Sequence, residues 1–98
     1  MSVFSVRIDK LNDAANKFGV IIERMDNQKN KYTNLIQEID NSWDGLASIA
    51  YIRRMRGELT KLNNMRKYTV ALRKYCINTA EKMESIDKIL RKLLDLLS

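Results

Sequence analysis

Apolar residues recur along the first half of the chain at alternating steps of three and four, the spacing that gives one apolar face on an α-helix. A single polar residue, Lys29, interrupts this pattern, and a second apolar line runs beside it through Ala14, Ile21 and Leu35. The pattern predicts a helix over about 6–41, with an apolar face wider than a two-stranded coiled coil needs. The members of the main line are Ile8, Leu11, Ala15, Phe18, Ile22, Met25, Lys29, Tyr32, Ile36 and Ile39.

The first residues of the chain lie outside this pattern, which becomes regular at Ile8. Residues 1–7 are expected to form a short arm that offers apolar contacts through Val3, Phe4 and Val6. Ser5 is the residue expected to cap the first helix, because a serine hydroxyl can accept a hydrogen bond from a free amide at a helix start.

The second half of the chain also has a helical pattern, and it predicts a helix over about 46–96. Its apolar line begins at Ile52, Met55, Leu59 and Leu62 and then slips by one short step, which is expected to overwind a coiled coil locally. After the slip the line is expected to continue through Met65, Thr69, Leu72, Cys76, Thr79, Met83, Ile86, Leu90, Leu93 and Leu97.

Between the two patterns, residues of about 42–45 are expected to form a turn. Gly45 can take the left-handed conformation that ends a helix or opens a turn. Asp44 can cap the following helix, where its charge also suits the helix dipole. A connection this short predicts an antiparallel helical hairpin, so residues 1–98 are expected to form one all-α domain. Because one hairpin leaves half of each apolar line in water, two hairpins are expected to pair into a four-helix bundle.

Composition supports this prediction and limits the chemistry. The 98 residues include no proline, three glycines and no histidine, which favours long helices and removes the commonest metal ligand. The single cysteine, Cys76, excludes an intrachain disulfide, and its place on the apolar line predicts a buried thiol. No apolar run approaches the roughly 20 residues of a membrane span. With no catalytic grouping of side chains, the chain is not expected to be an enzyme or to hold a metal or cofactor.

Charge is uneven along the chain. The net charge of the chain is +6. Residues 46–98 hold twelve basic and five acidic side chains, and their net charge of +7 is larger than that of the whole chain. Arg66, Lys67, Arg73 and Lys74 repeat at intervals of seven and predict a basic face on the second helix. Such a face can dock an acidic partner helix, bind phosphate backbones or simply be solvated. A basic helical nucleic-acid-binding protein is therefore the alternative function, and a membrane-active amphipathic protein is a third.

The tripeptide Trp43-Asp44-Gly45 stands near the middle of the chain, between the two helical patterns. In this setting, and at this chain length, it resembles the Trp-x-Gly signature of the WXG100 (ESAT-6-like) family. The resemblance covers nearly the whole chain. It implies a helical hairpin that dimerises head-to-tail into a four-helix bundle. It also implies export by the type VII (ESX-like) secretion system of Gram-positive bacteria, without a cleaved signal peptide, after synthesis in the cytoplasm.

One feature of many family members is missing. A Tyr-x-x-x-Asp/Glu export signal often follows their second helix, but here Leu72 follows Tyr68 and Thr79 follows Tyr75 at that spacing. Small proteins of this kind also accompany large LXG-type toxins, whose helical N-terminal domains they bind. The partner implied is therefore the chain itself, another WXG100-like protein or an LXG-type toxin, and nucleic acid is not expected.

The partner-binding residues expected from these patterns fall into three sets. The turn motif is Trp43, Asp44 and Gly45. The basic set is Arg66, Lys67, Arg73 and Lys74. The apolar set is Ile8, Leu11, Phe18, Ile22, Met25, Ile36, Leu72, Met83, Ile86 and Leu90.

Overall fold

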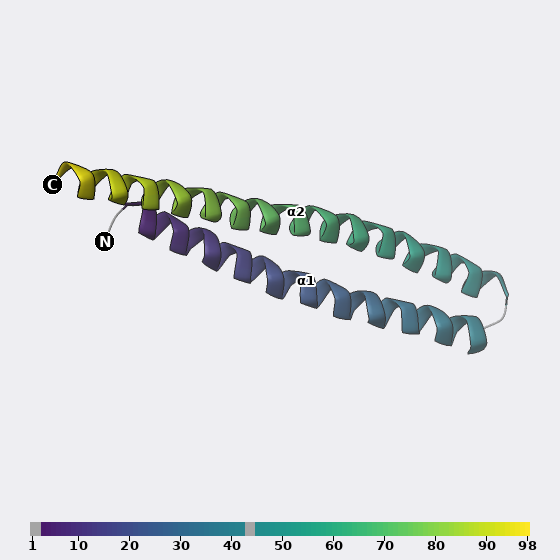
Figure 1. The fold of residues 1–98 in the computed structure, drawn as a ribbon. Helices are drawn as coiled ribbons and strands as arrows, with labels where there is room; N and C mark the ends of the chain where they lie inside the picture. Colours follow the sequence, from purple (N-terminus) through teal and green to yellow (C-terminus); the bar gives the residue numbers. More distant parts are fainter. Residues whose placement is uncertain (1–2, 43–44) are drawn as a thin grey trace. The chain divides into compact units, whose positions relative to one another are not determined.

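The computed structural model describes residues 3–42 and 45–98, and nearly all of them are helical. Helix α1 spans Val3–Ser42 and helix α2 spans Leu46–Leu97 (Figure 1). Helices of 40 and 52 residues need a sequence without internal breakers, and this chain has no proline. The all-α prediction is confirmed for the described residues, which include no strand.

The chain divides into two compact units, and each contains a stretch of both helices. The terminal unit comprises residues 1–19 and 70–98, and the turn unit comprises residues 20–69. In the turn unit, Asp26 of α1 pairs with Arg66 of α2, while Asp40 lines the same hollow as Ile49 and Arg53. Later residues of α1 thus meet earlier residues of α2, which confirms the hairpin arrangement. The four-helix bundle requires a second hairpin and stays a prediction.

The connection between the helices depends on Gly45. Its φ of 98° is in the left-handed region, as the sequence predicted, where a side chain brings strain. The Gly45 carbonyl accepts a bond from the Ile49 amide at 3.4 Å and one from the Ser48 hydroxyl at 2.8 Å. Gly45 therefore holds the cap position at the start of α2. Trp43 and Asp44, including the predicted capping role of Asp44, lie outside the described residues.

The prediction of an N-terminal arm is wrong for residues 3–7, the part of it that the structure describes. Helix α1 already begins at Val3, so Ser5 lies inside the helix and does not cap it. Phe4 is half-buried and Ile8 is buried. Phe4 lies four residues before Ile8, so the apolar line of α1 extends one turn further back than the sequence pattern suggested. Burial of this aromatic ring is the physical reason for the longer helix.

The predicted apolar line of α1 is confirmed. Ile8, Ala15 and Ile39 are buried, and the other members are half-buried, apart from the exposed Lys29. Of the second line, Ala14 and Leu35 are half-buried and Ile21 is exposed. Most of the wide apolar face of α1 is therefore covered within the chain.

The predicted slip in the apolar line of α2 is wrong. The positions of α2 that lie against α1 follow one another at steps of four and three without interruption. We call them the contact stripe. They are Ser48, Ile52, Met55, Leu59, Leu62, Arg66 and Thr69 in the turn unit, and Arg73, Cys76, Ala80, Met83 and Asp87 in the terminal unit. All are buried or half-buried except Arg73, which is exposed but lies over Gly19.

The sequence pattern went wrong because the contact stripe includes charged residues. At this point the sequence pattern assigns the apolar Met65 to the line in place of its charged neighbour Arg66, but Met65 is exposed. Cys76 is buried on the contact stripe, as predicted. Within the described residues, neither helix contains a stretch long and apolar enough to span a membrane.

Candidate functional site

The predicted apolar partner-binding residues separate into two groups. Most of them are already engaged inside the hairpin: Ile8 is buried, and the half-buried ones are Leu11, Phe18, Ile22, Met25, Ile36 and Met83. The remaining three are exposed on α2, with fractions of 50% for Leu72, 47% for Ile86 and 43% for Leu90. This second group is the more available to another molecule.

In the terminal unit, α2 has a second apolar line, which we call the outer stripe. Each member comes one residue before a position of the contact stripe. Beyond Asp87 the same spacing continues the contact stripe to positions 90, 94 and 97, and the members there come one residue before these positions. The outer stripe is therefore turned about 100° around the helix axis from the contact stripe. Its large apolar members are all exposed, and Thr79 and Lys82 occupy the two positions in its middle. The stripe consists of Leu72, Tyr75, Thr79, Lys82, Ile86, Ile89, Leu93 and Leu96.

Tyr75 and Ile89 are members of the outer stripe that the sequence analysis missed as site residues. The fractional exposure of Tyr75, 68%, is high for an aromatic side chain and gives the stripe one of its largest free apolar surfaces. A search of the sequence for a second heptad line beside the first finds both residues, because the steps from Leu72 to Leu96 alternate between three and four without exception.

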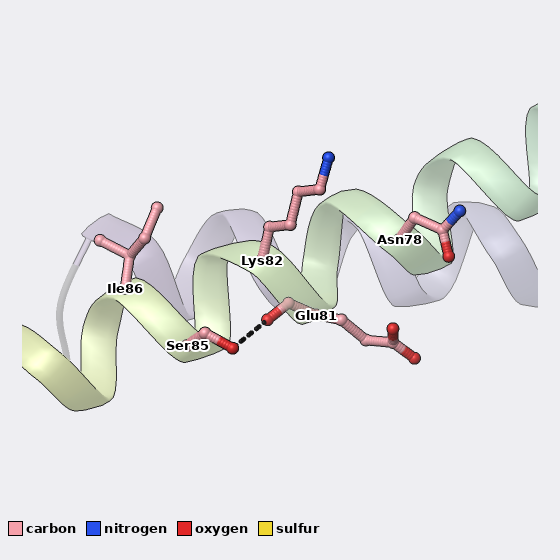
Figure 2. A pocket seen from close by; sticks show the side chains of 5 residues that line it. All are labelled: Asn78, Glu81, Lys82, Ser85 and Ile86. Atoms are coloured by element: carbon pink, nitrogen blue, oxygen red, sulfur yellow. Dashed lines mark hydrogen bonds between the residues drawn. The ribbon is translucent and has the colours of Figure 1, made fainter.

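Small, uncharged side chains border part of this stripe. Asn78 and Ser85, with Glu81, Lys82 and Ile86, line a shallow hollow of about 590 Å³ (Figure 2). The Ser85 hydroxyl donates a hydrogen bond to the Glu81 carbonyl at 3.1 Å, so it is satisfied within the helix. The short side chains of Asn78 and Ser85 leave room at these two positions for another helix to approach α2 closely.

A second hollow lies in the terminal unit where α1 meets α2. It has a volume of about 320 Å³ and is lined by Arg7, Lys10, Leu11, Thr79 and Met83. Because Thr79 belongs to the outer stripe, this hollow borders the stripe on the side that faces α1. The outer stripe thus has depressions on both edges near its middle.

The predicted basic face does not act as one surface. The Arg66 Nε donates to Asp26 Oδ1 at 2.7 Å, and its Nη2 donates to Oδ2 at 3.3 Å. The guanidinium of Arg73 lies over the backbone of Gly19, with Nε 3.6 Å from the point a Cβ there would occupy. Two of the four residues are therefore directed toward α1.

The other two basic residues are Lys67 and Lys74, and both are exposed. Neither makes an ion pair with any residue that the structure describes. They are the members of the predicted set that can meet a partner directly. Of the turn motif, the structure describes only Gly45. A Cβ added to Gly45 would have no atom within 4 Å, so the space beside this residue is open.

The interhelical pair also sets the local electrostatics. The hydrogen bond from Arg66 is the main reason that the pKa of Asp26 lies below its ordinary value of 3.8, with smaller help from the positive charges of Arg66 and Lys29. The same bond raises the pKa of Arg66. Both groups are therefore charged at neutral pH and act as a fixed link between the helices.

Neither the scan against protein-family models nor the searches of curated proteins and of solved structures found a match to this chain. The resemblance to the WXG100 family therefore rests on the residues themselves.

Proposed function

We propose that this chain is a WXG100-like component of a type VII secretion system that binds a protein partner by helix packing. The observation that carries the proposal is the place of Trp43-Asp44-Gly45: it falls at the connection between two long helices, and Gly45 there has a φ of 98°. A glycine required by the backbone, two residues after a tryptophan in the sequence, is the arrangement that the family signature implies.

The outer stripe supports the partner-binding part of this proposal. Large apolar side chains that stay exposed along one line of a helix are typical of protein interaction sites. A second hairpin laid on this line completes a four-helix bundle. That hairpin belongs to a second copy, another WXG100-like protein or the N-terminal domain of an LXG-type toxin.

Nucleic-acid binding remains the alternative, and its support is weaker. The Asp26 carboxylate neutralises Arg66, and the Arg73 side chain is directed along α1. Lys67 and Lys74 are the two members of the expected basic face that are not directed toward α1. Phosphate-directed binding depends on several basic groups acting together, so the pairing of Arg66 with Asp26 weakens this alternative.

The decisive experiment uses the gene neighbourhood. The first step is to establish whether a gene for an LXG-type toxin lies beside the gene for this chain. The N-terminal domain of such a toxin is then co-produced with the chain, and the complex is captured through a tag on the toxin domain. We expect capture of the unaltered chain, and weaker capture of the Trp43→Ala variant. In the native bacterium, export of the toxin is expected to require both this chain and the FtsK-like ATPase of the system.

Random duplex DNA serves as the comparison ligand. Binding to the duplex near physiological salt, with no binding to the toxin domain, would favour the nucleic-acid alternative. Full capture of the Trp43→Ala variant would remove the main support for the family assignment.

A further inference from the structure

We propose that the outer stripe of the terminal unit docks one amphipathic helix of a different, acidic protein, which presents a carboxylate to Lys82. This inference rests on the proposed partner-binding function and deepens it, because it names the surface and the chemistry of the partner.

The length and spacing of the stripe suit a helix. From Leu72 to Leu96 the stripe runs for about 36 Å along α2, at 1.5 Å per residue. Its alternating steps are those of a coiled-coil seam, which accepts the apolar residues of one neighbouring helix. The exposed apolar residues of the seam are Leu72, Tyr75, Ile86, Ile89, Leu93 and Leu96.

Helix α1 of the same chain does not cover this seam. Arg73 lies over Gly19, and Leu11 of α1 lines a hollow with Thr79 and Met83 of α2. Arg73 lies opposite Gly19, and the helices are antiparallel. Val3, the first described residue of α1, is 16 residues before Gly19 and therefore lies opposite about Ile89, 16 residues after Arg73. The last two turns of α2, which carry Leu93 and Leu96, therefore extend past the described part of α1.

Lys82 argues against a second copy as the occupant. It is the one charged residue within the seam, and its neighbours on the stripe are Thr79 and Ile86. A second copy in parallel places its own Lys82 directly opposite, and an antiparallel copy centred on the stripe places it about one helical turn away. Two ammonium groups then approach each other in an apolar seam, where like charges are costly.

The charges beside the seam point to an acidic partner. Along its solvent-facing edge, Lys74, Lys88 and Lys92 outnumber Glu81 and Asp95. Asp87 is not part of this edge and pairs with Arg91 at 3.1 Å. Opposite charge along the rim of an interface mainly sets partner choice and association rate, and a charged residue inside a seam sets register. A glutamate-rich helix with one glutamate inside its apolar line complements both the basic rim and Lys82 inside the seam.

Two synthetic peptides test this directly. Each is an amphipathic helix of about 25 residues, long enough to follow the seam at 1.5 Å per residue. Both carry leucine and isoleucine at the seam positions. One carries glutamate at the central seam position and along the flanks, and the other carries lysine at the same places. Fluorescence anisotropy with the full chain measures the two affinities.

We expect the glutamate peptide to bind and the lysine peptide to bind at least about tenfold more weakly. Lys82→Glu should reduce or invert this preference. Ile89→Ser combined with Leu93→Ser should weaken binding by about tenfold or more, as loss of two apolar anchors of an interface does. The matched control is Val20→Ser on α1, which also alters an exposed apolar residue and should leave affinity unchanged.

Several results overturn the inference. Equal binding of both peptides would show that the surface does not select an acidic partner. Self-association in sedimentation that disappears in the Ile89→Ser, Leu93→Ser variant makes a second copy the occupant. Binding to vesicles of equal parts phosphatidylcholine and phosphatidylglycerol, with none to either peptide, makes the stripe a membrane surface.

The peptide assay also separates this inference from the proposed function. If the chain binds the glutamate peptide through the stripe but captures no toxin domain, the docking surface stands and the secretion role fails. If it captures the toxin domain and the Ile89→Ser, Leu93→Ser variant does so equally well, the secretion role stands and the docking surface fails.

Discussion

Arg66 of α2 and Asp26 of α1 are joined by two hydrogen bonds, from Nε to Oδ1 at 2.7 Å and from Nη2 to Oδ2 at 3.3 Å. The two-point contact fixes both the distance and the orientation of the guanidinium relative to the carboxylate. It therefore specifies the register of the two helices in the turn unit. Its contribution to stability is modest, because the side chains are 42% and 46% exposed and water screens the attraction.

The pair predicts an acid-sensitive contribution to stability. The Arg66 hydrogen bond lowers the pKa of Asp26, so the charged carboxylate is favoured in the folded state. This contribution is present above the ordinary pKa of an unfolded aspartate and is lost as the pH falls through the lowered pKa. Asp26→Asn should therefore unfold at slightly lower urea concentration than the unaltered chain at pH 7. The difference should shrink toward zero in strong acid.

Glu23→Gln is the matched control, since Glu23 is an exposed carboxylate on the same helix without an ion pair among the described residues. Its urea midpoint should follow that of the unaltered chain at every pH. If the Asp26→Asn difference is independent of pH, the ion pair does not stabilise the hairpin.

Charge reversal distinguishes the two adjacent basic positions. Arg66→Glu places a carboxylate opposite Asp26, so two like charges meet in place of the ion pair. Lys67→Glu makes the same change in net charge, from +6 to +4, at an exposed side chain. We expect Arg66→Glu to lower the melting temperature by a few degrees and Lys67→Glu to leave it nearly unchanged. Circular dichroism during heating measures both, and equal melting temperatures would contradict the assigned contact.

Two glycines predict opposite effects of the same substitution. Gly45 has a φ of 98°, where alanine costs about 1–2 kcal/mol of backbone strain. Gly57 lies inside α2 with no atom within 4 Å of an added Cβ. Alanine there should stabilise the helix by about 0.5–1 kcal/mol. Urea denaturation should therefore give a lower unfolding free energy for Gly45→Ala and a higher one for Gly57→Ala. A shift in the same direction for both variants would argue against the left-handed turn.

Much of the fold follows from the sequence, and α1 shows why. Its apolar residues form one clear line, so burial at Ile8, Ala15 and Ile39 could be predicted from spacing alone. Gly45 was predicted as the turn residue because only a few residue types suit a left-handed backbone. Both inferences depend on local properties of the chain.

The register of α2 could not be predicted in the same way. Two apolar lines lie one residue apart on this helix, and periodicity alone does not tell which one faces α1. The line that does so carries Arg66, and the line that faces solvent carries Leu72. Arg66 is accommodated because Asp26 lies opposite it, 40 residues away in the sequence. Information of that kind belongs to pairs of residues, and the pattern of one helix at a time does not contain it.

The register can be tested with two methionines of α2. Met55 is on the contact stripe and only 8% exposed, whereas Met65 lies on the predicted line only after its slip and is 56% exposed. Truncating a buried methionine to alanine removes apolar contacts and leaves a cavity, at a cost of about 2–5 kcal/mol. Truncating an exposed one changes stability by about 0.5 kcal/mol or less. Alanine has a helix propensity at least as good as that of methionine, so the helix itself is not weakened in either variant.

We therefore expect Met55→Ala to lower the urea midpoint clearly and Met65→Ala to leave it almost unchanged. Both variants remove the same atoms from the same helix, within the same unit of the chain. A difference between them must then come from what each side chain contacts. If Met65→Ala destabilises the chain as much as Met55→Ala does, α2 meets α1 through the slipped line, which contains both methionines, and the contact stripe described above is wrong.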